Sequence, residues 1–364
     1  MAFVDSALLE ILACPACLGQ LRFEPTADAP FLEGSLTCDR CERAYAIRAG
    51  LPLLLLKDAR WKDNRLEIKD ETELVDEMPD SEQVKRNRFE TQRSWEFLKK
   101  IPIPHRPLVL DIGGSAGIGA YLFRSFQAHV VVVDIVPSFL VMGKMSLGEK
   151  VDLSPAAADM EWLPFADETF DVVFCRQALH HSSTPRQAVR EMFRVAKTGG
   201  HVLLVSEPCR TAYHRIKEWY ERKRHGLRLE KGEGLLQRLP DLTFQYTWGD
   251  FKRTFSQLAP DYCIERAVGA ATMRPTEDGI AYDPGIDARG KLGRILDRIL
   301  PFGQGHRGDV NVSARKTAPV RRETACPEEV RPVDPRDLEV EVPSKEEVQY
   351  FRGMLEGIFA GMQW

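Results

Sequence analysis

The sequence predicts an α/β fold built on a mostly parallel sheet, with a small separate unit before it and one helix after it. Short apolar runs at Leu108–Leu110 and Val130–Val133 each end at an acidic residue, and a glycine-rich turn follows the first. Segments with helical apolar spacing separate such runs. Continuous apolar runs that alternate with helices are typical of strands buried on both faces of a parallel sheet.

The length and composition are those of an ordinary globular protein with room for two domains. The chain has 364 residues, of which 43% are hydrophobic and 29% charged, and its net charge is −4. This charge predicts no general attraction to nucleic acid. The N-terminus does not resemble a signal peptide, and no apolar run approaches the ~18 residues of a membrane span. We therefore expect a cytoplasmic protein without a membrane span.

Four cysteines in the first domain, expected over residues 1–56, have the spacing of a metal site. Cys14 and Cys17 form one C-x2-C pair, Cys38 and Cys41 form a second, and twenty residues separate the pairs. Such pairs supply the four thiolates of a tetrahedral zinc site. Four thiolates leave no open coordination position, so we expect a structural zinc ion. Four unligated thiols or two disulfides are the alternative.

The stretch between the two expected domains is charged and poor in aromatic side chains, which predicts a linker over residues 57–80. A second domain is expected over residues 81–317, beginning with a helix at Ser81–Lys100.

The turn after the first apolar run carries the pattern D-x-G-x-S-x-G. Glycines allow a sharp turn and let a ligand lie against bare peptide. A dinucleotide site needs G-x-G-x-x-G, which this spacing does not give. The acid at the strand end suits instead the positively charged amino group of S-adenosylmethionine. The residues expected to contact this cofactor here are Asp111, Gly113, Gly114, Ser115 and Gly117.

A helix is predicted over Ile118–Phe126, and Val130–Val133 then forms a second strand that ends at Asp134. An acid about twenty residues beyond the glycine turn is placed to bind both ribose hydroxyls of a nucleoside. The alternative is that Asp134 only caps the helix that begins near Pro137. We favour ribose binding because the strand, the acid and the spacing agree.

Over Leu108–Pro208 the chain resembles class I S-adenosylmethionine-dependent methyltransferases of small molecules. The glycine turn corresponds to the first motif of that family, with Ser115 in place of the commoner glycine, and two further runs match it, LPFADETFDVVF at Leu163–Phe174 and REMFRVAKTGGHVLLVSEP. The resemblance implies a Rossmann-like, seven-stranded methyltransferase sheet. It also implies that the last two strands, Cys263–Val268 and Asp309–Lys316, form an antiparallel pair.

The resemblance further assigns residues to the cofactor. Asp159 would accept a hydrogen bond from the adenine amino group, and the backbone at Met160 would read the ring. Ile135 would contact the nucleoside, and Cys175 would lie near the methionine part. Two aromatic residues of the preceding helix would cover the pocket, as in the family, or simply pack in the core: Phe89 and Trp95.

The sequence around the first four cysteines, LLEILACPACLGQLRF and LTCDRCERAYAIRAGLPLLL, resembles the small zinc-ribbon proteins that bind and activate methyltransferases. In those proteins an apolar strand after the A-I-R-A-G-L-P turn adds to the methyltransferase sheet. Leu53–Leu56 either does the same here or belongs to the core of the ribbon, and both alternatives stay open. Covalent attachment would raise the effective concentration of such a partner domain.

Two histidines are the candidate catalytic residues. His180 and His181 follow the predicted fourth strand, beside the expected methyl group. A histidine is well matched to taking a proton from a hydroxyl group near neutral pH. A histidine pair is also frequent at this position of the family without that role. A lone Cys209 lacks the surrounding motif of a nucleophile, so inert packing is the simpler expectation.

Further helices and insertions complete the second domain. Thr184–Lys197 predicts a helix that begins with a Thr184–Gln187 capping box. Two insertions, about 210–247 and 271–308, leave the sheet on the side where open α/β sheets bind substrates. The first is basic, with nine Lys or Arg against four Glu in Arg210–Arg238, and the second contains the basic segment Lys291–Leu300.

The end of the chain predicts a linker and a helix. Residues 318–343 are rich in proline and charge, and a capping box at Ser344–Glu347 starts an amphipathic helix within 344–364. This helix docks back on the core, which we expect, or pairs between chains.

Three classes of function remain. The first is methyl transfer to a small-molecule, lipid or saccharide acceptor, and the local basic excess suits an anionic one. The second is an RNA or protein methyltransferase that uses the zinc ribbon as a substrate-reading or activating module; the net charge disfavours it without excluding it. The third is a non-catalytic binding protein, which the presence of three acids at strand ends disfavours.

Overall fold

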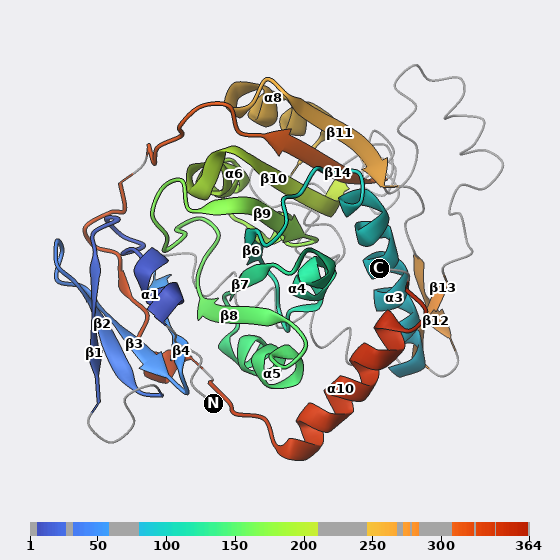
Figure 1. Cartoon of the computed structure of the whole chain (residues 1–364), viewed down its shortest axis with the longest axis horizontal. Helices are drawn as coiled ribbons and strands as arrows, with labels where there is room; N and C mark the ends of the chain where they lie inside the picture. The colour runs from blue at the N-terminus through green and yellow to red at the C-terminus, as the bar shows by residue number, and fades with distance from the viewer. Residues whose placement is uncertain are drawn as a thin grey trace, which may run out of the picture.

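The computed structural model describes residues 6–26, 32–57, 80–209, 246–267, 272–276, 279–283, 308–323, 325–338 and 340–362 (Figure 1). Its centre is a seven-stranded sheet in the order β11-β14-β10-β9-β6-β7-β8. The strands from β10 to β8 are parallel, and β14 runs antiparallel to both β10 and β11. The predicted α/β fold and its antiparallel last pair are thus confirmed. The strands are β6 (Leu108–Ile112), β7 (His129–Asp134), β8 (Asp152–Ala157), β9 (Phe170–Arg176), β10 (Ala196–Cys209), β11 (Tyr262–Ala267) and β14 (Gly308–Arg315).

Helices cover both faces of this sheet, and side chains alternate between two cores. In β7, Val131 and Val133 face the core that includes α6 and α8, whereas Val130 and Val132 face the core that includes α3, α5 and α10. Burial on both faces explains the unbroken apolar run of this strand. The helical segments are α3 (Asp80–Leu98), α4 (Ile118–Tyr121), η1 (Leu122–Phe126), α5 (Pro137–Leu147), η2 (Leu179–His181), α6 (Pro185–Val195), α8 (Trp248–Leu258) and α10 (Lys345–Phe359).

The N-terminal residues form a separate small unit, drawn in blue in Figure 1. Its four antiparallel strands follow one another in the order β1-β2-β3-β4. One short helix precedes them. The elements are α1 (Ser6–Ile11), β1 (Leu21–Pro25), β2 (Gly34–Cys38), β3 (Ala44–Arg48) and β4 (Leu51–Pro52).

This small unit is joined to the edge of the main sheet by backbone hydrogen bonds. Leu53 forms a parallel bridge with Ala157 at the end of β8, and the N–H of Leu54 donates to the carbonyl of Ala157 at 2.8 Å. Leu12 forms a second, antiparallel bridge with Phe165. Of the two alternatives for Leu53–Leu56, the structure therefore supports extension of the main sheet.

The segment expected as a linker, 318–343, is packed against the small unit. Within it, β15 (Arg331–Pro332) pairs antiparallel with β5 (Leu56–Lys57), and η4 (Pro335–Asp337) follows. Lys57 Nζ lies 2.7 Å from Asp337 Oδ2. The segment thus connects β14 to the last helix while it contacts the N-terminal unit.

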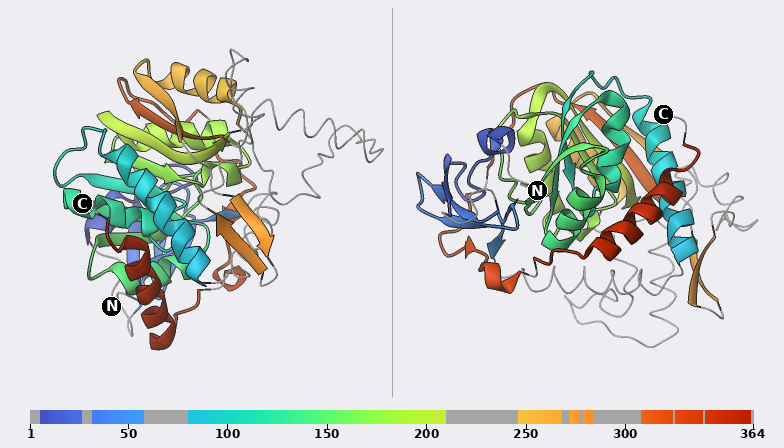
Figure 2. Two further views of the ribbon diagram at one scale, coloured as in Figure 1. Left: turned by 90° about the vertical axis from the view of Figure 1, so that its right-hand side faces the viewer. Right: turned by 60° about the horizontal axis from the view of Figure 1, so that its bottom comes forward.

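The last helix docks on the core, as expected. Figure 2 shows α10 beside α3, and it also contacts α5. The ring of Phe359 stacks on Tyr121, with centroids 3.7 Å apart. The predicted capping box is present, since the Ser344 hydroxyl accepts from the Glu347 N–H and the Glu347 carboxylate accepts from the Ser344 N–H.

The capping box predicted at Thr184 and Gln187 is wrong. The Thr184 side chain accepts no hydrogen bond from the helix and instead donates to the buried carboxylate of Glu161. The helix also ends at Val195, two residues earlier than expected, because β10 begins at Ala196.

Several expected segments fall outside the described residues. These are the linker at 58–79, most of the insertion at 210–247, and Lys291–Leu300 in the other. Within the second insertion the structure describes a hairpin of β12 (Thr272–Thr276) and β13 (Gly279–Asp283).

Candidate functional site

Three of the predicted acids lie at the carboxyl ends of adjacent strands. Asp111 is near the end of β6, Asp134 ends β7, and Asp159 follows β8 by two residues. The strands are in register, because Ile112 pairs with Val133 and Asp134 pairs with Ala157. Ligands of open α/β sheets bind at this edge.

The glycine turn brings bare backbone to this edge. Gly113 has a φ of 63°, and a Cβ there would lie 2.3 Å from the Cβ of Ala178. Ser115 also has a positive φ, of 46°, which explains why glycine is commoner at this position of the family. The turn therefore exposes peptide groups that larger residues would cover.

A pocket opens between this turn and the end of β9. Asp111 is 1% exposed, and its Oδ2 has no hydrogen-bond partner within the described residues. The same holds for the buried Nη1 of Arg176, at the end of β9. Burial raises the pKa of Asp111 to about 7; Arg176 opposes this shift and Asp134 adds to it. The lining residues are Asp111, Gly113, Gly114, Ser115, Ile118, Gly119 and Arg176.

Asp134 is held next to the glycine turn. Its Oδ2 accepts the N–H of Ser115 at 2.9 Å and its Oδ1 accepts the N–H of Val136 at 3.0 Å. Burial raises the pKa of Asp134, and these two amide hydrogen bonds oppose the shift. Ile135, the next residue, is half-buried.

The loop after β8 carries Asp159 and Met160 and is anchored by Glu161. One oxygen of Asp159 accepts the N–H of Glu161 at 2.8 Å. The buried carboxylate of Glu161 accepts from the hydroxyls of Ser182 and Thr184. This residue, which the sequence did not indicate, ties the loop to the segment that follows the histidine pair.

The histidine pair lies just beyond β9 and is held by Glu207 of β10. The Glu207 carboxylate accepts the N–H groups of Ala178, Leu179 and His180, and its Oε1 is 2.9 Å from His180 Nδ1. The rings of His180 and His181 have centroids 4.1 Å apart. His181 also lies near enough to lower the pKa of Asp134.

Four of the expected cofactor residues line this pocket, namely Asp111, Gly113, Gly114 and Ser115, while Asp134, Ile135, Asp159 and Met160 lie at or after the ends of β7 and β8 and are not part of its lining. Cys175 and Gly117 do not line it either. The side chain of Cys175 is fully buried in the core that contains α6, and burial raises the pKa of its thiol. Gly117 has a φ of 81° and lies at the N-terminal end of α4, where it shapes the turn. Trp95 packs in the other core, against Phe126, rather than over the pocket.

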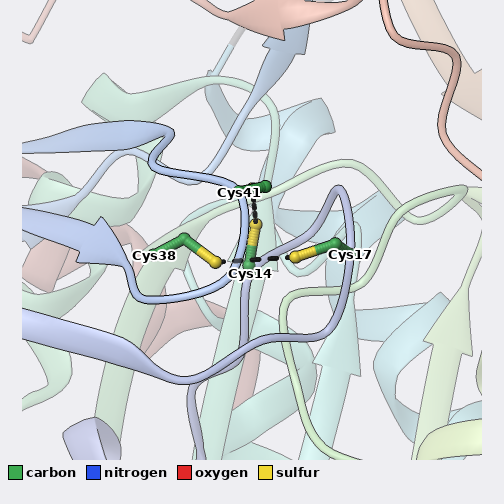
Figure 3. Close-up of side chains that lie close together, drawn as sticks. All are labelled: Cys14, Cys17, Cys38 and Cys41. Atoms are coloured by element: carbon green, nitrogen blue, oxygen red, sulfur yellow. Dashed lines mark hydrogen bonds between the residues drawn. The ribbon is translucent and has the colours of Figure 1, made fainter.

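The four predicted metal ligands come together at one point of the N-terminal unit (Figure 3). Their sulfur atoms all lie within 4.8 Å of one another, with Cys14 and Cys41 at 3.7 Å and Cys17 and Cys38 at 3.5 Å. A zinc ion bonded to four sulfurs at ~2.3 Å places them about 3.8 Å apart. The cluster therefore fits a tetrahedral zinc ion.

The surroundings of the cluster also fit a cation. Burial raises the pKa of the Cys14 thiol, so that a bound cation is what would stabilise its thiolate form. The hydroxyl of Tyr45 lies 3.3 Å from Cys14 Sγ. Gly19 leaves space that a side chain would take, because a Cβ there would be 2.9 Å from Cys38 Sγ.

Two family models match the chain. Residues 110–204 match the methyltransferase domain, and residues 5–50 match the Trm112p-like protein family. The chain therefore contains a methyltransferase domain preceded by a Trm112p-like zinc-ribbon domain, which confirms both resemblances. Among the described residues, none of the helices combines the length and apolar character needed to cross a membrane.

Curated relatives match part of the chain. The uncharacterized methyltransferase YcgJ of Bacillus subtilis is 38% identical over 99 residues, or 27% of this chain and 39% of that protein. The ubiquinone/menaquinone biosynthesis C-methyltransferase UbiE of Roseobacter denitrificans is 30% identical, over 27% of this chain and 41% of that protein. Phosphoethanolamine N-methyltransferase 1 of Triticum aestivum is 30% identical, over 34% of this chain and 24% of that protein. These matches span less than half of each relative.

Solved structures are similar at a lower level. The crystal structure of YcgJ from Bacillus subtilis has a TM-score of 0.43 and 19% identity, and covers 62% of this chain and 99% of that one. A chain of the complex between the Haloferax volcanii Trm112 methyltransferase activator and a methyltransferase has a TM-score of 0.40 and 17% identity, and covers 62% of this chain and 90% of that one.

Proposed function

We propose that this chain is an S-adenosylmethionine-dependent methyltransferase that acts on a small-molecule, lipid or saccharide acceptor and carries its zinc-ribbon partner domain in the same chain. The observation that carries the proposal is the buried Asp111 carboxylate, whose Oδ2 lacks a partner beside a bare glycine turn. A buried carboxylate oxygen without a partner is costly, and a ligand cation removes that cost.

The cofactor roles follow the three strand ends. Asp111 binds the ammonium group of the methionine part, and the backbone of Gly113, Gly114 and Ser115 faces the ligand. Asp134 and Ile135 bind the ribose, since the carboxylate is already oriented by two amide groups. The adenine lies against the loop of Asp159 and Met160. The cofactor supplies a methyl group on a positively charged sulfur.

The protein positions the acceptor and takes its proton. His180 is the candidate base, because the Glu207 carboxylate holds a proton at Nδ1 and leaves Nε2 as the acceptor atom. His181 lies near enough to Asp134, the acid assigned to the ribose, to lower its pKa, so we assign His181 to the nucleoside part of the site and not to proton transfer. The four cysteines would hold a zinc ion that stabilises the ribbon, and four thiolates would leave it no open position for the transfer.

The acceptor class rests on the relatives and on charge. Two of them are named for quinone biosynthesis and for phosphoethanolamine, which are small or lipid-like acceptors. The net charge of −4 does not favour RNA. The Trm112p-like domain favours the second candidate, an RNA or protein acceptor.

Transfer of labelled methyl groups separates these candidates. The full chain is incubated with methyl-labelled S-adenosylmethionine and host extract fractionated into RNA, protein, lipid and small solutes. We expect label in the lipid or small-solute fraction, and none with Asp134→Asn or Asp111→Asn. Label in RNA or protein would support the alternative acceptor. Absence of cofactor binding by calorimetry would overturn the methyltransferase proposal itself.

A further inference from the structure

Arg176 occupies an unusual place for a cation. It ends β9, one residue beyond the pair that Cys175 makes with Ile112 of β6, so it lies beside the glycine turn. Its side chain lines the same pocket as Asp111. Strand ends at this edge of the sheet face the ligand rather than the core.

One donor of the guanidinium group is buried without a hydrogen-bond partner. Nη1 is inaccessible to solvent and has no hydrogen-bond partner in the described part of the chain. Burial lowers the pKa of Arg176, while the negative charges of Glu90 and Asp111 oppose this shift. Glu90, on α3, is engaged by Arg86 at 3.2 Å. A buried cation with an unused donor is costly unless a ligand supplies the missing acceptor.

We propose that Arg176 binds the α-carboxylate of the cofactor's methionine part, opposite Asp111, so that the two residues together recognise an amino-acid zwitterion. This inference rests on the proposed cofactor. The planar guanidinium matches a carboxylate through two parallel hydrogen bonds. The pocket has one unused buried acceptor and one unused buried donor, and an α-amino acid presents an ammonium and a carboxylate on one carbon.

The same pair disfavours an anionic acceptor in this pocket. A phosphate or carboxylate from an acceptor would satisfy Arg176 but would face the carboxylate of Asp111, which burial already makes costly to ionise. A zwitterion has no net charge and leaves the charge balance of the pocket unchanged. The amino-acid end of the cofactor is therefore the occupant that both residues favour.

The test uses decarboxylated S-adenosylmethionine, which keeps the nucleoside, the sulfonium and the amine but lacks the carboxylate. Calorimetry measures its affinity and that of S-adenosylmethionine for the full chain. We expect the wild type to prefer S-adenosylmethionine by about 10- to 100-fold, the range of charge-assisted hydrogen bonds. Arg176→Gln abolishes this preference by weakening S-adenosylmethionine alone. Asp111→Asn weakens both ligands.

Arg106→Gln is the matched control, because Arg106 is exposed before β6 and its substitution leaves both affinities unchanged. If Arg176→Gln does not fold, Arg176→Lys keeps the charge but loses the planar fork, and we expect most of the preference to be lost. An unchanged preference in either folded variant, or an equal loss for both ligands, would overturn the inference. A wild type that binds neither ligand would overturn the proposed function instead.

Discussion

The Nδ1 atom of His180 lies 2.9 Å from Oε1 of Glu207. Glu207 is 1% exposed, and its carboxylate also accepts three backbone N–H groups of the loop after β9. The residues are 27 positions apart and belong to neighbouring segments after β9 and within β10. One buried acid thus fixes both the loop and the orientation of the ring. This arrangement makes Glu207 a positioning residue for the candidate base.

We expect Glu207→Gln to lower kcat by about tenfold or more, within the range that a positioned base contributes. The reason is that an amide cannot accept from all three loop N–H groups and hold the ring as a carboxylate does. The measurement is a double-mutant cycle with His180→Ala, read in kcat and in cofactor affinity. If Glu207 acts through the ring, its substitution has a smaller effect on kcat once His180 is removed. Equal effects in both backgrounds would contradict this role.

Cofactor affinity should depend on pH through Asp111. Its pKa of about 7 lies above the ordinary value of 3.8, so most of these carboxyl groups are protonated at pH 6 in the free protein. An ammonium ligand needs the ionised form, and we expect binding at pH 6 to be about tenfold weaker than binding to the fully ionised carboxylate. Calorimetry in buffers of different ionisation enthalpy would detect proton release on binding. Asp111→Asn should remove the dependence.

The Asp111 carboxyl group should also make the stability of the ligand-free protein depend on pH. Its native pKa exceeds its unfolded value, so the native state binds more protons between about pH 4 and pH 7. The contribution of Asp111 to the free energy of unfolding therefore falls as pH rises through this window. Urea titrations at several pH values, compared with Asp111→Asn, measure it. A wild-type slope equal to that of the variant would refute the raised pKa.

Much of the fold follows from local sequence. Val130–Val133 is apolar on both faces of a strand, and Asp134 ends it, so the strand and its acid could be predicted together. The spacing of the four cysteines was enough to predict that they form one cluster. By contrast, the apolar run Leu53–Leu56 would suit the core of the ribbon and the edge of the main sheet equally well. Only the bridge from Leu53 to Ala157 distinguishes the two alternatives.

The missed residues share one physical cause, which is that their partners are distant in sequence. In the sequence Arg176 is an ordinary polar strand end; only the structure brings it near the negative charges of Asp111 on β6 and Glu90 on α3. Thr184 and Gln187 have the local pattern of a capping box. Glu161, more than twenty residues earlier, binds both side chains instead: its buried carboxylate accepts from the Thr184 hydroxyl, and its backbone carbonyl accepts from Gln187 Nε2.

Zinc removal should destabilise both domains. The N–H of Ala13, next to the first ligand, donates to the carbonyl of Pro164 at 2.9 Å, in the loop that leads from Asp159 to β9. We therefore expect about one zinc per chain, and Cys38→Ser should lose the metal, lower the melting temperature and weaken cofactor binding. Cys263→Ser, at an exposed cysteine, is the control. Retention of full cofactor affinity by metal-free protein would show that the domains are uncoupled.

Arg322 lies in the segment 318–343, and its side chain should be the main polar connection between this segment and the rest of the molecule. It donates to the carbonyls of Pro15 and Leu163 and to the carboxylate of Glu191, and its guanidinium lies 5.3 Å from the ring centroid of Trp162. Because Glu191 is buried and Pro15 lies between two zinc ligands, one side chain links the ribbon to α6 and to the cofactor loop.

We expect Arg322→Ala to lower the free energy of unfolding by about 2–4 kcal/mol, because it leaves a buried carbonyl and part of a buried ion pair without a donor. Arg321→Ala, at the exposed neighbouring position, should change it by less than about 0.5 kcal/mol. Urea unfolding followed by circular dichroism measures both. Arg322→Lys should recover only part of the loss, since a single ammonium cannot replace the several donors of the guanidinium. Equal stability of Arg322→Ala and Arg321→Ala would show that the apolar contacts alone hold the segment in place.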